Sequence, residues 1–189
     1  ILDIGQILKS CAVTFRGFSM HYQPIVDIET NKVFAAEALV RWKVDGKFIN
    51  PETFIGIAEN IGVMKQLGNY ILDTTIKQLS DWNSYIRSDL CMTINASVKQ
   101  FNIEFSDRLA ANIKKYAINP RNIIIEVTES VFLSEEQVNT VQRIRSMGCK
   151  IAIDDFGTGY SSLSYLKKFP IDIIKIDKLF INDWESTEN

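Results

Sequence analysis

Short apolar runs typical of strands alternate along this chain with longer amphipathic stretches typical of helices. The predicted strands cover residues 19–28, 33–42, 91–96, 123–127, 151–153 and 171–176. The predicted helices cover residues 4–10, 65–86, 106–116, 134–147 and 161–169, and one more begins at Asn50-Pro51-Glu52. Pro51 suits the first position of that helix, because its missing N–H would have no helical partner there. From about residue 91 onward the pattern repeats strand, then helix.

Several of the predicted strands are apolar on both faces. Ile123-Ile124-Ile125 does not alternate in polarity, and neither does Asp172-Ile173-Ile174. Runs of this kind suit strands of a parallel sheet that helices cover on the outside. Together with the strand–helix repetition they predict one α/β domain, built as a parallel sheet or a (β/α) barrel.

Composition narrows the class of protein further. The 189 residues are 46% hydrophobic and 23% charged, as in an ordinary folded chain. The 21 Lys and Arg against 23 Asp and Glu give a net charge of −2, which offers no basic surface for duplex nucleic acid. Cys11, Cys91 and Cys149 form no CxxC pair, which argues against a disulfide framework or a zinc site and favours a reducing cytosol.

The start of the chain favours a segment of a longer protein. It begins at Ile1 without a signal peptide, and no apolar run approaches the ~20 residues of a membrane helix. Residues 1–18 are therefore interpreted as a connector from an upstream domain. A membrane anchor or sensor in that upstream part would leave no trace in this sequence.

Polar, chemically capable side chains stand at or near the carboxyl ends of most predicted strands. They are Glu37, Asn95, Glu126, Asp154, Asp155, Lys175 and Asp177. An ionisable group in an apolar strand costs several kcal/mol unless it is paired or bound to a metal. Because parallel strands end at the same edge, these groups are expected to converge where barrel enzymes keep their active sites. Carboxylate and amide oxygens favour Mg²⁺ or Mn²⁺ over zinc, and adjacent Asp154 and Asp155 suit the pair of metals used in phosphodiester hydrolysis.

Structural alternatives exist for single members of this set. Asn95 alone is typical of a turn or a helix cap, and Asp154-Asp155 before Phe156-Gly157 is typical of a turn. Gly157-Thr158-Gly159 hints at a dinucleotide-binding loop, but Ser162 stands where that fingerprint has its third glycine. Only the recurrence of such residues on successive strands favours a shared site.

Six segments carry a resemblance to a known family. They are Tyr22-Gln23-Pro24-Ile25-Val26, Glu37-Ala38-Leu39-Val40-Arg41-Trp42, Asn95-Ala96-Ser97, Glu126-Val127-Thr128-Glu129, Asp154-Asp155-Phe156-Gly157-Thr158-Gly159-Tyr160-Ser161-Ser162-Leu163 and Lys175-Ile176-Asp177. In order and spacing they resemble the EAL family, the cyclic di-GMP phosphodiesterases of bacterial signalling. The resemblance runs from about residue 19 to the end, and it implies a modified (β/α)8 barrel, similar to a TIM barrel, with an antiparallel first strand.

The resemblance also implies roles for individual residues. Carried over position by position, the implied metal ligands are Glu37, Asn95, Glu126, Asp154 and, for a second metal, Asp155. Glu37 and Asp155 thereby belong to the catalytic set, with Lys175 to orient or activate the attacking water. The implied substrate contacts are Gln23, Arg41 and Asp177, of which Asp177 also supports Lys175.

The implied activity is Mg²⁺- or Mn²⁺-dependent cleavage of one phosphodiester of cyclic di-GMP, giving the linear dinucleotide pGpG. Glu129 resembles the residue that steadies the following loop, which with its helix implies a homodimer coupled to the site. A sensor or GGDEF-type domain upstream and a cytoplasmic location complete the expectation. The alternative is a catalytically inactive module that binds cyclic di-GMP or another protein.

The family pattern continues beyond the last residue of this sequence. An AEGVE-like seventh strand with a metal-binding Glu and an eighth strand with a substrate-binding Gln are expected after residue 182, but the chain ends at Asn189. Residues 19–189 are thus interpreted as an EAL domain with about six of its eight strands. Either the remaining strands are missing from this sequence, or a partner covers the gap, or the chain is naturally short, which would favour the inactive alternative.

Overall fold

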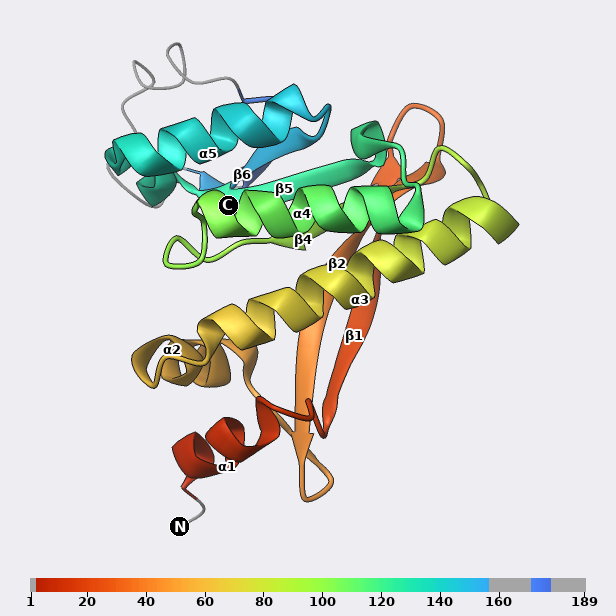
Figure 1. Ribbon diagram of the computed structural model, residues 1–189. Coiled ribbons are helices and arrows are strands. Elements are labelled where there is room, and N and C mark those ends of the chain that lie inside the picture. Colours follow the sequence, from red (N-terminus) through yellow and green to blue (C-terminus); the bar gives the residue numbers. More distant parts are fainter. Residues whose placement is uncertain (1–2, 157–170, 178–189) are drawn as a thin grey trace, which may run out of the picture.

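The computed structural model describes residues 3–156 and 171–177 and shows one mixed β-sheet with helices along one face (Figure 1). The strands are β1 (Phe18–Asp27), β2 (Lys32–Val44), β3 (Lys47–Ile49), β4 (Cys91–Asn95), β5 (Ile123–Thr128), β6 (Lys150–Phe156) and β7 (Ile173–Ile176). Their order across the sheet is β1-β2-β4-β5-β6-β7, and β3 pairs with β2.

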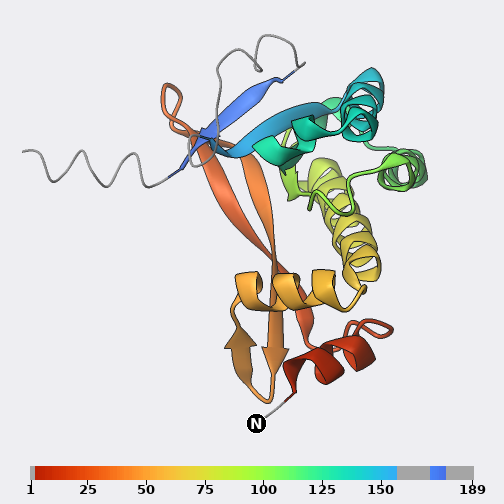
Figure 2. The same cartoon turned by 90° about the vertical axis from the view of Figure 1, so that its left-hand side faces the viewer.

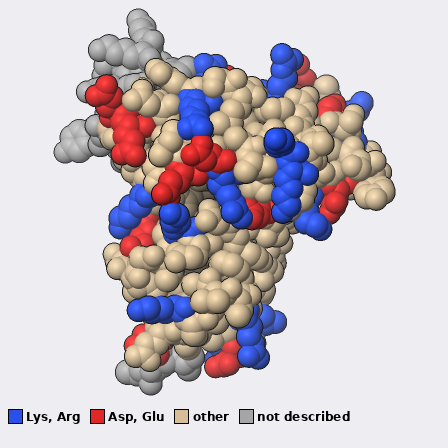
Figure 3. All heavy atoms as spheres, in the orientation of Figure 1, with Lys and Arg blue, Asp and Glu red and all other residues tan. Residues whose placement is uncertain are grey.

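Helices cover the outer face of the sheet. They are α1 (Ile4–Cys11), α2 (Pro51–Asn60), α3 (Met64–Tyr85), α4 (Ile103–Tyr116) and α5 (Glu135–Ser146), with 3-10 turns η1 (Pro120–Asn122) and η2 (Glu129–Leu133). Figures 1 and 2 show α3, α4 and α5 side by side along the sheet, while α1 and α2 lie near the long β1–β2 ribbon. Both signs of charge are interspersed over the face in Figure 3.

Strand directions agree with the sequence-based fold class. β1 runs antiparallel to β2, whereas β2, β4, β5, β6 and β7 run parallel to one another. Among the described strands, β1 and β7 are the two ends of the path, so this sheet is open rather than a closed barrel. The α/β class, the antiparallel first strand and the incomplete barrel are confirmed.

The core explains why these apolar runs become strands. β5 is buried from Ile123 through Val127, and β2 buries alternate residues such as Ala38 and Trp42 under the helices. On the helix side, α3 contributes the fully buried Ile76 and Leu79. Helix α1 joins the same core through Leu8, of which 1% is exposed. In the described part of the chain, no helix combines the length and the apolar character needed to span a membrane.

Element bounds differ from the sequence prediction at a few places. Helix α4 begins at Ile103, three residues before the predicted start, because the Asn102 side chain accepts a hydrogen bond from the Phe105 N–H and caps the helix. β6 extends to Phe156 rather than stopping at residue 153, and β3 was not predicted. The helix predicted over 161–169 and the Gly157–Gly159 motif lie outside the described residues.

Candidate functional site

The carboxyl ends of the parallel strands bring polar side chains to one edge of the sheet. Pairing sets Glu37 of β2 beside Thr93 of β4, and Asn95 beside Glu126 of β5. Because side chains alternate between faces, Glu37, Leu39 and Arg41 share the face opposite the buried Ala38 and Val40. The strand-end groups therefore project from the inner face of the sheet, away from the helices.

Lys175 of β7 lies at the centre of this arrangement. Its Nζ is 2.6 Å from Glu126 Oε2, 3.1 Å from Asp154 Oδ1 and 3.4 Å from Glu37 Oε2. Asn95 Nδ2 donates to Glu37 Oε1 at 3.1 Å. We call Glu37, Asn95, Glu126, Asp154 and Lys175 the strand-end cluster; five different strands supply its members.

Burial makes this cluster electrostatically unusual. The Glu126 side chain is 0% exposed, and that burial raises its pKa even though the Lys175 ammonium acts to lower it. Burial by itself would lower the pKa of Lys175, but the hydrogen bond to Glu126 and the nearby carboxylates outweigh it and raise that pKa. One described cation thus faces three carboxylates, and Glu126 Oε1 is buried without a hydrogen bond to any described residue.

A local irregularity places two adjacent acids at the same site. The β6–β7 register shifts between Ile153 and Phe156, so Asp154 and Asp155 occupy a bulge. Asp155 has φ 51°, in the left-handed region that aspartate tolerates better than most residues. Desolvation, the Asp154 charge and a hydrogen bond with Asp177 together raise the pKa of Asp155. Regular strand geometry would send these two side chains to opposite faces.

A pocket of about 670 Å³ opens over Asn95, Glu126 and Asp154 of the strand-end cluster. Its floor includes Asn95, Glu126, Asp154 and Asp155, and its apolar walls include Leu39, Ile55 and Ile71. Helix α2 closes one side; it begins after Asn50, whose side chain accepts a hydrogen bond from the Glu52 N–H at 3.0 Å. A cavity with convergent acids and apolar walls is the form expected of a ligand site.

Of the other predicted site residues, Arg41 lines this pocket, whereas Gln23 and Glu129 are not among its lining residues. Arg41 Nη1 donates to the Val40 carbonyl at 2.9 Å. Gln23 lies on exposed edge strand β1, directly opposite Glu37 in the β1–β2 register. Glu129 is the half-buried first residue of η2, between the pocket residues Thr128 and Ser130.

Sequence reasoning missed the contribution of helix α2 and of the loop after β4. Glu59 of α2 and Ser97 and Lys99 of the loop all line the pocket. The segment Asn95-Ala96-Ser97 carried part of the family resemblance, so Ser97 had a signal without an assigned role. Glu59 had none, because a polar residue near a helix end usually faces solvent.

The donor set fits a hard divalent cation in its chemistry. Glu37, Asn95, Glu126 and Asp154 offer carboxylate and amide oxygens from four strands, and the buried Glu126 Oε1 has acceptor capacity to spare. Residues 3–156 and 171–177 contain no group of three or more acidic, His or Cys side chains already at ligand spacing. The Lys175 ammonium lies among the carboxylates instead.

Comparison with known families matches residues 10–189 to the EAL domain. The chain is 39% identical to signaling protein YkoW of Bacillus subtilis over 170 residues, which are 88% of this chain and 21% of YkoW. It is 36% identical to the probable cyclic di-GMP phosphodiesterase PdeB of Escherichia coli over 177 residues, 92% of this chain and 34% of PdeB. The chain therefore spans between about a fifth and a third of these curated relatives.

Solved structures of EAL proteins are also similar to this chain. PaMucR phosphodiesterase in its c-di-GMP complex superposes with a TM-score of 0.88 at 33% identity, over 96% of this chain and 75% of that one. An EAL domain protein from Listeria monocytogenes EGD-e has a TM-score of 0.80 at 28% identity, over 100% of this chain and 74% of that one. The likeness thus covers the strands that carry the cluster.

Proposed function

The chain belongs to the EAL domain family, and from that premise we propose that it is a metal-dependent phosphodiesterase that hydrolyses cyclic di-GMP. One phosphodiester bond is cleaved, which opens the cyclic dinucleotide to linear pGpG. The observation that carries this proposal is the convergence of Glu37, Glu126 and Asp154 on Lys175, at a pocket that Glu126 and Asp154 line. Relatives named as cyclic di-GMP phosphodiesterases support the choice of substrate.

Mg²⁺ or Mn²⁺ is the proposed cofactor, at a site for two ions. Glu37, Asn95, Glu126 and Asp154 would hold the first ion, and Asp155 would face the second. When bound, such ions supply Lewis-acid stabilisation of the phosphoryl oxygens and lower the pKa of water. Asp155 suits this role because the β6 bulge brings it to the pocket beside Asp154.

The chain's own residues orient the substrate and the attacking water. The Lys175 ammonium orients a water for in-line attack, with Asp177 supporting it. The Arg41 guanidinium suits the phosphate, since its planar donors match two oxygens at once. Gln23, opposite Glu37 in the register, supplies an amide contact to the dinucleotide.

The remaining proposals concern the surroundings of the site. Glu129 steadies the segment that follows β5, and this loop with α5 forms a homodimer interface. An upstream sensor or GGDEF-type domain controls the activity, and the domain acts in the cytoplasm. Residues 1–18 serve as the connector to that upstream part, although α1 also buries Leu8 in the core.

Product analysis tests the proposal directly. Purified natural full-length protein is incubated with cyclic di-GMP and Mg²⁺, Mn²⁺ or EDTA, and the nucleotides are separated by chromatography. We expect linear pGpG with either metal and no product with EDTA. Binding of cyclic di-GMP without turnover would replace the enzyme by the receptor alternative, and neither binding nor turnover would overturn both.

A further inference from the structure

The loop after β4, residues 96–102, forms one wall of the substrate pocket. Ser97, Val98 and Lys99 line the pocket, next to Asn95 at the end of the strand. The Ala96 N–H donates to the Glu126 carbonyl at 2.9 Å, so the first residue of the loop still belongs to the sheet. Beyond Ala96 the loop leaves the sheet, and its position depends on other contacts.

Glu59 on α2 supplies two of those contacts. The Ser97 hydroxyl donates to Glu59 Oε1, and Lys99 Nζ is 3.2 Å from Glu59 Oε2. Only 24% of the Glu59 side chain is exposed, whereas the Lys99 side chain is 59% exposed, so the hydrogen bond from Ser97 is the stronger of the two contacts. The hydrogen bond from Ser97 holds the pKa of Glu59 below its ordinary value, despite the opposing effect of burial. Each carboxylate oxygen therefore engages a different loop residue.

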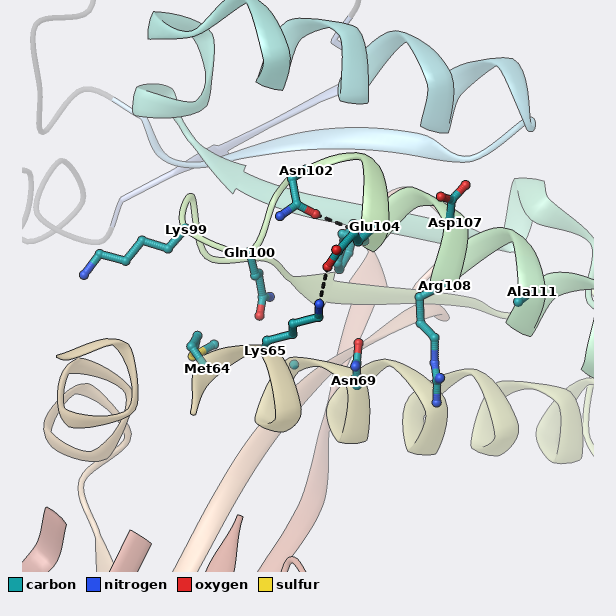
Figure 4. A pocket seen from close by; sticks show the side chains of 12 residues that line it. Met64, Lys65, Asn69, Lys99, Gln100, Asn102, Glu104, Asp107, Arg108 and Ala111 are labelled. Atoms are coloured by element: carbon teal, nitrogen blue, oxygen red, sulfur yellow. Dashed lines mark hydrogen bonds and ion pairs between the residues drawn. The ribbon is translucent and has the colours of Figure 1, made fainter. Parts of the chain in front are cut away.

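Other contacts hold the far half of the loop, where the Phe101 side chain is buried in the core. A cavity of about 510 Å³ adjoins the loop and shares Met64 and Lys99 with the substrate pocket (Figure 4). Gln100 reaches into it and packs against Gly68, where a Cβ would collide with Gln100 Oε1. That oxygen is buried and accepts no hydrogen bond from the described residues. Gln137 Nε2 donates to the Val98 carbonyl at 3.0 Å, which leaves Glu59 as the anchor for Ser97 and Lys99.

We propose that Glu59 is a positioning residue, which holds Ser97 and Lys99 of this loop in the position that receives substrate. This inference rests on the proposed function, because it concerns the pocket in which cyclic di-GMP is hydrolysed. Glu59 acts through Ser97 and Lys99 rather than on the reacting phosphate. Without this anchor the loop samples other positions, and the fraction of molecules ready to bind substrate falls.

Glu59→Ala tests the role in the full-length protein. A smaller fraction of competent loop raises the apparent dissociation constant in proportion, so we expect KM for cyclic di-GMP to rise about tenfold. We expect kcat to change less than about threefold, because substrate binding restores the loop. A role in folding alone would instead reduce the amount of active protein, lowering apparent kcat at unchanged KM, and that result would overturn the proposal.

Two further variants and a control sharpen this test. Glu59→Gln keeps a carbonyl acceptor for the Ser97 hydroxyl and should recover KM to within about threefold of the wild type. Ser97→Ala should raise KM, and combined with Glu59→Ala it should add little, because both remove the same bond. The control is Glu104→Ala, which breaks an exposed ion pair to Lys65 nearby (Figure 4) and should leave KM unchanged.

Hydrogen exchange of the amides in residues 96–102 separates this inference from the proposed activity. Faster exchange in Glu59→Ala than in wild type and in Glu104→Ala is the expected result. Unchanged exchange would overturn the positioning role whatever the kinetics. If wild type shows no turnover while exchange still rises, the hydrolysis proposal fails and the anchoring of the loop stands.

Discussion

Two groups of charged residues in this molecule use similar side chains in different ways. The strand-end cluster surrounds one ammonium, Lys175, with three carboxylates at the inner edge of the sheet. Between α3 and α4, Asp73 binds Arg108 and also accepts from Asn112 Nδ2 at 2.6 Å. In that helix pair each described acid meets a base or a neutral donor, so the local charge is balanced.

This difference in charge balance distinguishes an ion-pair network that only stabilises the fold from a candidate functional site. Balanced ion pairs need nothing further, and their stabilisation is modest. An excess of buried carboxylate is costly unless something else brings positive charge. In the strand-end cluster, three carboxylates face the single ammonium of Lys175, so positive charge is in short supply among the described residues. The imbalance therefore indicates a function, and variants in both regions can test the interpretation.

The largest effect is expected from Glu37→Ala. Loss of one proposed metal ligand should reduce turnover of cyclic di-GMP at least about a hundredfold, since even residues that only orient metal ligands are worth 10–100-fold. Stability should change little, because Lys175 keeps Glu126 and Asp154 as partners. Steady-state kinetics with Mn²⁺ measures the loss of turnover, and thermal unfolding measures the change in stability. Glu29→Ala removes the same charge from the exposed β1–β2 turn and serves as the control; retained turnover in Glu37→Ala would contradict the ligand role.

Lys175→Met should reduce turnover about a hundredfold and change affinity for cyclic di-GMP less than about threefold, because its proposed contact is to the attacking water. It also leaves three carboxylates without their cation. With Lys175 28% exposed, we expect a loss of about 2 kcal/mol of unfolding free energy, less than for a fully buried pair. Added Mg²⁺ should restore part of that loss in thermal unfolding. Equal losses in affinity and turnover would argue against the role on water.

Much of the fold could be predicted because the signal is local. The isoleucine run of β5 and the amphipathic pattern of α3 are visible in single segments of sequence. β3 was missed because it has only three residues and little burial, although Asp45-Gly46 is a strong hairpin signal. Both turn residues have positive φ, as such a hairpin requires.

The sequence allowed the residues of the candidate site to be predicted, but not their arrangement in space. Polar residues at strand ends can be recognised in the sequence because they interrupt apolar runs, as Glu126 does after three isoleucines. The bulge at Asp154 and Asp155 depends on pairing with β7, which no local pattern encodes. The Glu59–Ser97 bond joins residues 38 positions apart, so only the packing of α2 against the loop reveals it.

The stabilising effect of the network of Asp73, Arg108 and Asn112 should depend on pH and not on added metal ions. Arg108 and Asn112 hold the pKa of Asp73 below its ordinary value against the effect of burial. A lowered folded-state pKa means that its stabilisation is complete above the unfolded value of about 3.9 and is lost as pH falls through the folded value. Asp73→Asn should therefore cost about 1 kcal/mol at pH 7, and the gap to wild type should shrink below about pH 4. Urea unfolding across pH tests this; a gap that grows in acid would contradict it.

The smallest effect is expected from Glu104→Ala, because its partner Lys65 and Glu104 itself are both mostly exposed, at 66% and 60% of their side chains. Water and salt screen such a pair, so unfolding free energy should change by less than about 0.5 kcal/mol, and the change should vanish in 1 M salt. Turnover should not change. Urea unfolding at low and high salt measures this, with Lys65→Ala as the reciprocal variant. A loss of unfolding free energy above about 1 kcal/mol would contradict this prediction. Charge balance alone would then not distinguish the ion pairs of the outer helices from the strand-end cluster, and the distinction would depend on burial.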